Sequence, residues 1–307
     1  MDTGLVFIQL LNGLQLGILL FLLAAGLTLV FGIMDFVNLA HGSLYMMGAF
    51  FVATLAQWSG SFLLAVALSI PLVVLLGIAV ELVAIRTLYP RDHLDQVLAT
   101  FGLILFFDGF VHLVWGANGM TVPLPDWLEG QIVFSESFSF PTFRVLIISV
   151  GLAVALGLFL VVTRTRIGML IRAGASNRTM VGALGVDIKT LFTLVFAGGA
   201  ALAGLAGMMI SPITEASIGM GNQIIIVAFV VIIIGGIGSI KGAFIAALIV
   251  GLIDTMGRSY LDELFALLMP VRYAETAAPA VSAMLIYILM AAILAFRPQG
   301  LFPPKGR

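Results

Sequence analysis

The sequence predicts an all-α polytopic membrane protein, a bundle of about 8–9 transmembrane helices that forms one domain over residues 1–307. Composition is the first observation behind this prediction. Hydrophobic residues make up 62% of the chain and charged residues 9%, against about 45–50% and about 25% in soluble domains. The second observation is a succession of nine apolar runs. Each is expected to be a helix, because a helix satisfies its own backbone hydrogen bonds in lipid.

The apolar runs fit a bilayer core of ~30 Å, which about 20 helical residues cross. They cover residues 5–33, 40–56, 62–85, 97–115, 143–162, 191–213, 224–240, 242–256 and 278–296, of which three are short. No basic region precedes the first run, which is also longer than a signal-peptide core. We therefore expect it to be a retained span.

Residues 164–189 form the one long polar island between two membrane-spanning runs. This loop carries five of the fourteen basic residues: Arg164, Arg166, Arg172, Arg178 and Lys189. Good helix formers follow Arg172, and Gly185 stands at the expected C-terminal end, which predicts a short helix. We expect it to lie on the cytoplasmic face as a coupling loop and to present a docking surface to a partner.

The distribution of Lys and Arg predicts the orientation. With 164–189 in the cytoplasm, nine alternating spans place eleven of the fourteen basic residues inside. The N-terminus is then external and the C-terminus cytoplasmic. If one short run is re-entrant, the N-terminus changes sides and the C-terminal half keeps its orientation.

The largest external loop, 116–142, has three prolines and several acids but no Lys or Arg. One interpretation is an irregular external cap that faces a delivery partner. The other is a solvated loop anchored at the membrane interface by Trp115 and Trp127.

Two interruptions within apolar sequence predict broken or re-entrant helices near 34–43 and 234–242. Such breaks are tolerated at membrane depth only where the backbone is buried in protein or lines a wet cavity, and paired breaks mark a transport pathway. The segments are candidate halves of an inverted repeat. Their candidate translocation-path residues are Asn38, His41, Ser43, Gly236 and Ser239.

Structural alternatives exist for both segments. Asn38, His41 and Ser43 can cap a helix at the cytoplasmic surface, and Gly238 with Gly242 has the spacing of a close helix contact. The small residues of 197–207 predict a helix that is central in the bundle, lies at a dimer interface or thins the wall of a path.

Three acids, Glu81, Asp108 and Asp254, fall in or near apolar runs, where an unpaired charge is costly. Arg86 and Arg258 follow the first and the last of them closely, so local ion pairing is the simpler interpretation. His112 lies four residues after Asp108, which allows a proton relay.

The sequence contains no nucleotide-binding or hydrolase motif and no cysteine. If transport uses ATP, a different chain must hydrolyse it. The net charge of −1 gives no indication of a nucleic-acid partner.

Four motifs, in order along nearly the whole chain, resemble the branched-chain amino acid permeases of bacterial ABC importers, the LIV-H type. They are Asn38-Leu39-Ala40-His41-Gly42, with Leu39 where the family usually has an aromatic residue, the pattern from Arg164 to Asp187, the stretch from Gly235 to Ala243, and the end from Arg297 to Phe302. The resemblance implies an inner-membrane permease that pairs with a second homologous permease, two cytoplasmic ATPases that use ATP and Mg, and a periplasmic solute-binding protein.

The resemblance also implies which residues couple to the ATPases, while this chain itself binds no cofactor. They are Arg172, Ala173, Gly174, Ala175, Ser176, Asn177, Arg178, Gly182 and Gly185. A hydrophobic amino acid is the expected solute, with urea, short amides and aromatic acids as alternatives. Two other classes remain: an ion-coupled secondary transporter or channel that uses the intramembrane acids, and a purely structural subunit.

Overall fold

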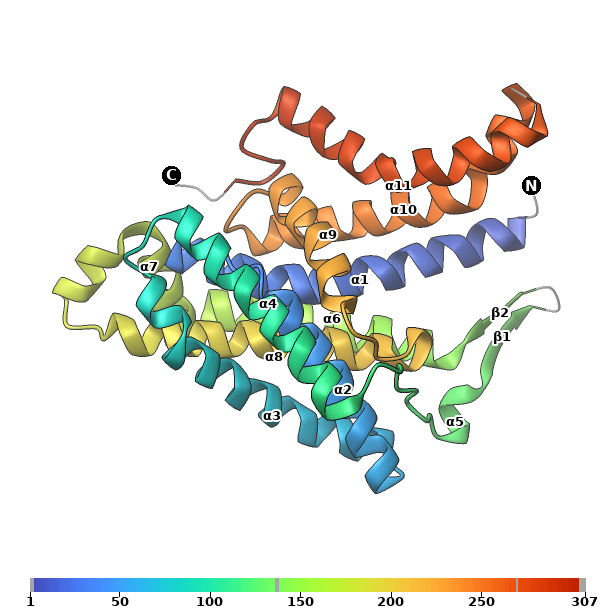
Figure 1. Cartoon of the computed structure of the whole chain (residues 1–307). Coiled ribbons are helices and arrows are strands. Elements are labelled where there is room, and N and C mark those ends of the chain that lie inside the picture. Colours follow the sequence, from blue (N-terminus) through green and yellow to red (C-terminus); the bar gives the residue numbers. More distant parts are fainter. Residues whose placement is uncertain (1–2, 136–137, 269, 304–307) are drawn as a thin grey trace.

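The computed structural model (Figure 1) describes residues 3–135, 138–268 and 270–303. Its helices are α1 (Thr3–Met34), α2 (His41–Ser59), α3 (Phe62–Val83), the 3-10 helix η1 (Ile85–Leu88), α4 (His93–Trp115), α5 (Asp126–Glu129), α6 (Thr142–Arg164), α7 (Arg166–Ala183), α8 (Ile188–Thr214), α9 (Met220–Gly235), α10 (Ile240–Leu268) and α11 (Val271–Phe296). Two strands, β1 (Gln131–Ser135) and β2 (Phe138–Pro141), form a hairpin.

Seven of these helices are long and apolar enough to cross a membrane: α1, α3, α4, α6, α8, α10 and α11. The shorter α2, of 19 residues, and α9, of 16 residues, account for two further apolar runs. The predicted all-α polytopic fold is confirmed, and the helices break near both predicted positions, since α1 ends at Met34 and α9 at Gly235.

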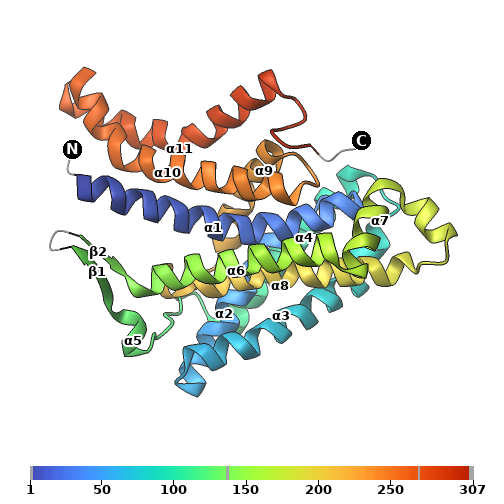
Figure 2. The same cartoon turned by 180° about the vertical axis from the view of Figure 1, so that it is seen from behind.

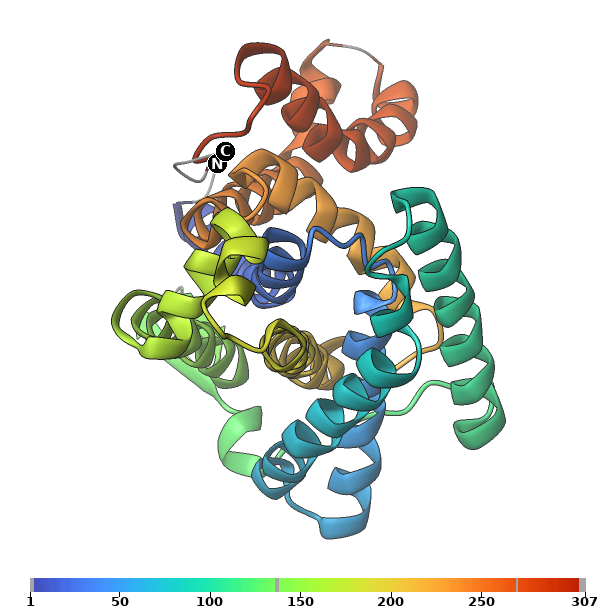
Figure 3. The same cartoon turned by 90° about the vertical axis from the view of Figure 1, so that its left-hand side faces the viewer.

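Helices α1 and α8 lie at the centre of the bundle, as the end-on view in Figure 3 shows. Most of α1 is buried, and small residues bring the two helices together where Gly26 faces Gly199. The small-residue segment 197–207 is therefore a central packing element, with Ala200, Ala203 and Ala206 fully buried. Helices α4, α6 and α11 lie at the periphery and expose most of their apolar surface, as membrane-facing helices do.

The two ends of the bundle differ. Helix α7 and the C-terminal segment lie at one end, and the hairpin and the start of α1 lie at the other (Figures 1 and 2). We refer to them as the α7 end and the hairpin end. This arrangement agrees with N- and C-termini on opposite sides of the membrane.

The loop 116–142 is more ordered than expected. Within 116–142 the chain forms α5 and the β1–β2 hairpin, in which Ile132 pairs with Phe140. Leu128 and Phe140 are buried against the bundle, so the loop is a folded cap, as the first interpretation held, but it is not irregular. The indole Nε1 of Trp115 donates to Thr54 Oγ1 at 2.7 Å.

Helix α10 is longer than its apolar run, which was expected to end near residue 256. It continues to Leu268, so much of the external loop expected there is helical. The reason is that helical hydrogen bonding does not stop at the membrane surface. Polar residues continue a helix into water, and the i,i+4 pair Asp254–Arg258 supports this one.

The chain contains an inverted arrangement of two broken helices. Helix α1 runs to the α7 end, and residues 35–40 then return into the bundle, where α2 begins. Helix α8 runs to the hairpin end, and residues 215–219 return to the start of α9. The first residue of each return, Asp35 and Glu215, has a positive φ, of 52° and 61°.

The two returns meet in the interior. A Cβ atom on Gly42 of α2 would lie 2.3 Å from the carbonyl oxygen of Gly221 of α9. A Cβ atom on Gly221 would lie 2.2 Å from the carbonyl oxygen of Gly42. The structural counterpart of 35–40 is therefore 215–219. The segment 236–239, which the sequence suggested as that counterpart, instead forms the turn between α9 and α10 at the α7 end.

Candidate translocation path and coupling surface

A cluster of buried polar side chains lies where α2 begins. Asn38, His41 and Ser43 are at most 1% exposed, as is Thr28 of α1. Within the described chain, the side-chain nitrogen and oxygen atoms of Thr28, Asn38 and Ser43 have no hydrogen-bond partner, and the ring of His41 lies against the backbone of Leu23. Since each unsatisfied buried polar group costs about 1–3 kcal/mol, this cluster is an energetic exception in an otherwise apolar core.

The cluster lies inside the bundle and not at its surface. The ring of His41 packs against Gly26 and Gly199, and from Gly26 the rest of α1 extends about 12 Å further toward the α7 end. No side chain caps the start of α2. The alternative of a surface helix cap is therefore wrong for these residues.

Helix α4 holds the backbone of the first break. The amide of Val37 donates to Gln96 Oε1 at 3.2 Å, and that of Leu39 donates to Thr100 Oγ1 at 3.3 Å. Gln96 and Thr100 are buried on one face of α4. Sequence reasoning missed both, although two polar residues four apart in an apolar helix are a usable signal.

Glycine contacts close the interior around the cluster. Besides the Gly42–Gly221 crossing, Gly48 of α2 packs on Gly204 of α8, where a Cβ atom would lie 2.4 Å from a backbone oxygen. Small residues allow helix backbones to approach this closely. The described state is thus closed at the level of the polar cluster.

The second break predicted from the sequence, now the turn 236–239 between α9 and α10, has different surroundings. The amides of Leu301 and Phe302 donate to the carbonyl oxygens of Ile234 and Gly235, at 2.8 and 3.0 Å. Gly300 packs directly on Gly236, whose φ is 101°. The last two motifs of the sequence therefore form one unit at the α7 end. Ser239 caps α10 there, with its Oγ accepting from the amide of Gly242 at 3.1 Å.

The five candidate path residues consequently form two groups. Asn38, His41 and Ser43 lie together in the interior. Gly236 and Ser239 lie beside the C-terminal segment, and Ser239 also borders a groove that Arg172 and Ser176 of α7 line.

The coupling loop contains a kinked helix. Helix α7 starts at Arg166, six residues earlier than expected, because Thr165 Oγ1 accepts from the amide of Gly168 at 3.1 Å and caps the start. Asn177 has extended φ and ψ of −156° and 91° inside it. Its Oδ1 accepts from the amide of Met180 at 2.9 Å, so Asn177 caps a second short helical piece.

This kinked helix sits on the ends of α1 and α8. Gly174 is buried and faces Ile33 and Leu191, where an added Cβ atom would lie at 3.5 and 3.4 Å from their side chains. Arg178 Nη1 donates to the carbonyl oxygen of Met34 at 3.4 Å. The remaining candidate coupling residues are wholly or partly exposed: Arg172, Ala173, Ala175, Ser176, Asn177, Gly182 and Gly185. With exposed Met180 and Leu184 they form a surface that is both basic and apolar.

Asp187 starts α8 and links it to α7. Its carboxylate accepts from the amide of Lys189 and from the hydroxyl of Thr190. The Thr190 hydrogen bond is the main cause that lowers the pKa of Asp187, so the carboxylate stays ionised at the helix start, where negative charge is favourable.

Two of the three acids in apolar runs form the expected local ion pairs. Glu81 bonds Arg86 through both oxygens, at 3.0 and 3.2 Å, and also accepts from Tyr89 and from Thr193 of α8. Burial raises the pKa of Tyr89, and the bond to Glu81 adds to it, so the phenol remains a donor. Asp254 pairs with Arg258 at 2.9 Å.

Asp108 has a different partner from the one expected. Its Oδ2 accepts from Asn222 Nδ2 of α9 at 2.8 Å, while His112 is exposed. The hydrogen bond joins α4 to the start of α9 near the Gly42–Gly221 crossing.

The chain matches, over residues 9–294, the family described as "Branched-chain amino acid transport system / permease component". It is 32% identical to the high-affinity branched-chain amino acid transport system permease protein BraD of Pseudomonas aeruginosa, covering 95% of this chain and 94% of the relative.

Two further relatives are similar along most of their length. The corresponding permease protein LivH of Escherichia coli K12 is 32% identical, covering 83% of this chain and 86% of the relative. A probable LivH permease protein of Methanocaldococcus jannaschii is 30% identical, covering 80% and 79%. No solved structure was found to match. Since the family match spans the whole bundle and the relatives are similar over at least four-fifths of the chain, this protein belongs to the family of branched-chain amino acid transport system permease components.

Proposed function

We propose that this chain is the transmembrane permease subunit of an ATP-binding cassette importer in the bacterial inner membrane. It forms the translocation path for branched-chain or other hydrophobic amino acids that a periplasmic binding protein delivers. The observation that carries this proposal is α7, an exposed basic and apolar helix seated on the ends of the two central helices. Family membership supports the same function.

The proposed assembly contains a second homologous permease and two cytoplasmic ATPase subunits. The ATPases bind ATP and Mg and carry out hydrolysis, and this chain contributes no nucleotide site. Their docking surface is the α7 helix with its exposed coupling residues. A basic helix with apolar side chains suits an acidic-rimmed apolar groove on such a partner.

The contacts of α7 supply a mechanical route to the path. Closure of the ATPase pair would move α7, and Gly174 and Arg178 transmit that movement to Ile33 and Met34 at the end of α1. The first break begins at the next residue, Asp35, and leads to Asn38 and His41. We propose that this movement separates the glycine contacts and exposes the buried polar cluster alternately to the two sides.

The solute proposal rests on the chemistry of the interior. The candidate path combines a few neutral polar groups with an extensive apolar surround, which suits a zwitterion with an aliphatic side chain. Urea, short amides and aromatic acids are the competing solutes. Each unlabelled solute can be tested as an inhibitor of the uptake of labelled leucine. Unlabelled leucine should inhibit this uptake most strongly.

Co-purification tests the assembly. The tagged chain, extracted from its native membrane, should carry ATPase subunits, and the double substitution Arg172→Glu/Arg178→Glu should release them and remove ATPase activity. Arg91→Glu/Arg164→Glu is the matched control, since it reverses two exposed charges at the same end outside α7. Absence of any ATPase in the wild-type preparation would overturn the proposal.

A further inference from the structure

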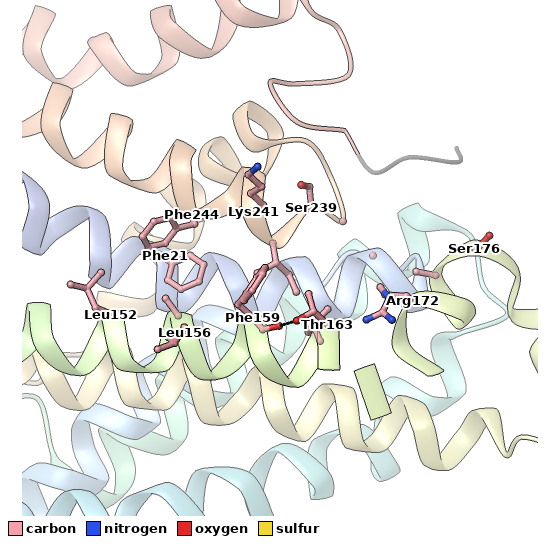
Figure 4. Close-up of a pocket in the computed structure, with 16 residues that line it drawn as sticks. Phe21, Leu152, Leu156, Phe159, Thr163, Arg172, Ser176, Ser239, Lys241 and Phe244 are labelled. Carbon is pink, nitrogen blue, oxygen red and sulfur yellow. Dashed lines mark hydrogen bonds between the residues drawn. The ribbon is translucent and has the colours of Figure 1, made fainter. Parts of the chain in front are cut away.

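A groove of about 670 Å³ runs along the membrane-facing side of the bundle at the α7 end. Helices α6 and α10 form its walls, α1 its floor, and α7 its end (Figure 4). Most of the lining is apolar, including Phe21, Leu156, Phe159 and Phe244. We call it the α6–α10 groove.

One wall of the groove is a continuous stripe along α6. Leu152, Leu156, Phe159 and Thr163 line it at successive helical turns, over about 16 Å. The first three are about half exposed in the isolated chain, at 45%, 60% and 57%. Because α6 is a membrane-spanning helix, the groove opens toward lipid tails and not toward water.

The end of the groove near α7 is positively charged. Arg172 enters the lining from α7 and Lys241 from the first turn of α10, and no described acidic residue lines it. Lys241 Nζ lies 5.8 Å from the centre of the Phe302 ring. Within the described chain, Arg172 has no hydrogen bond or ion pair. In the chain without its ATPase partners, both cations are therefore available at the level where α6 ends, which is headgroup depth.

We propose that the α6–α10 groove binds an anionic phospholipid, with its headgroup at the end that Arg172 and Lys241 line and an acyl chain along the α6 stripe. An amphiphile matches both halves of the groove in one molecule, apolar at membrane depth and anionic at its edge. Basic side chains at this level attract anionic lipid, and two of them predict a preference of at least about ten-fold over a zwitterionic lipid.

A second copy of the chain is the competing occupant. It would have to bring an acid against Arg172 and Lys241, and Asp35, Asp92 and Asp187 are exposed at this end, so dimerisation is one outcome of the test. The proposal goes beyond the transport function, because the site is complete in this chain alone.

Quenching of a tryptophan placed in the groove tests the proposal on the purified full-length chain. The reporter is Phe159→Trp, read against the wild type with its three native tryptophans. The probes are phosphatidylglycerol and phosphatidylcholine, each with a brominated acyl chain. Brominated phosphatidylglycerol should quench the added fluorescence at an at least about ten-fold lower mole fraction.

Charge variants then assign the preference. In the reporter chain, Arg172→Gln/Lys241→Gln should bring the two lipids to parity, while Arg164→Gln/Arg166→Gln should keep the preference. Equal quenching of the reporter chain by the two lipids would overturn the proposal. An equal loss of the preference for phosphatidylglycerol in the two charge variants would also overturn it. So would quenching that disappears as the chain dimerises, since a second copy would then occupy the groove. A thermal unfolding temperature equal to that of the reporter chain in each variant confirms that the bundle is intact.

Discussion

Asn177 shows how one side chain shapes a docking surface. It interrupts α7 and at the same time starts the next helical piece, where its side chain caps the amide of Met180. The bend lets Gly174 face the bundle while Arg178, four residues later, reaches the end of α1.

We expect Asn177→Ala to weaken the second piece of α7 by about 0.5–2 kcal/mol, because the cap of the Met180 amide is lost. ATPase activity stimulated by the binding protein should fall, while ATP hydrolysis by the separated ATPase subunits is unchanged. Asn177→Asp is the matched control, since its carboxylate also caps and should retain most of the stimulation. Equal loss in both variants would argue against the capping role.

The three acids in the apolar runs also separate transport mechanisms. Glu81→Gln removes an ion pair whose acid is fully buried, so the melting temperature in detergent should fall by at least about 2–4 °C. Asp254→Asn affects an exposed pair and should leave the melting temperature nearly unchanged.

Under the importer mechanism, Asp108→Asn and Asp254→Asn should both retain ATP-driven uptake. Uptake abolished by either one in a chain of wild-type stability would instead favour ion coupling.

At the scale of elements, the two broken helices depend on a single point of contact. Helices α2 and α9 cross through Gly42 and Gly221, and each backbone occupies the space of the other's missing side chain. This contact closes the interior next to the polar cluster. Opening of the path therefore has to separate or rotate this pair of helices.

Alanine substitution tests the crossing. Gly42→Ala and Gly221→Ala each place a Cβ atom within 2.3 Å of a backbone oxygen, so we expect little folded protein or a large loss of uptake. Gly102→Ala and Gly109→Ala on α4 meet no atom within 4 Å. They should fold normally or be slightly more stable, because alanine favours a helix by up to about 1 kcal/mol. Normal uptake in the two crossing variants would mean that the contact is not required.

The elements also show what sequence reasoning can find. The positions of the apolar runs, the ends of α1 and α9, and the pairs of Glu81 and Asp254 were predictable, because each depends on neighbouring residues. The length of α10 was not. The contacts of Gln96 and Thr100 with the first break join positions 59 and 61 residues apart, and no local pattern encodes them. The return at 215–219 reads as an ordinary interhelical loop, since only the fold shows that it re-enters the bundle.

At the scale of the whole molecule, the bundle contains two broken helices of opposite orientation, α1–α2 and α8–α9. One return enters the interior from the α7 end and the other from the hairpin end, and they meet at one level. Such symmetry suits alternating access, because the same opening movement is possible toward either side. The buried polar cluster lies at this meeting point.

The natural absence of cysteine allows a direct test of access to the cluster. We expect Asn38→Cys and Ser43→Cys to resist a small, membrane-impermeant thiol reagent in the isolated chain, because both positions are buried. In the assembled transporter they should react in at least one nucleotide state, and leucine should slow that reaction. Arg91→Cys, exposed at the α7 end outside the docking surface, should react with reagent on the α7 side in every state, and the buried Ala246→Cys in none. If Asn38→Cys and Ser43→Cys remain unreactive throughout turnover while leucine uptake continues, the solute passes elsewhere and the unpaired polar groups serve another purpose.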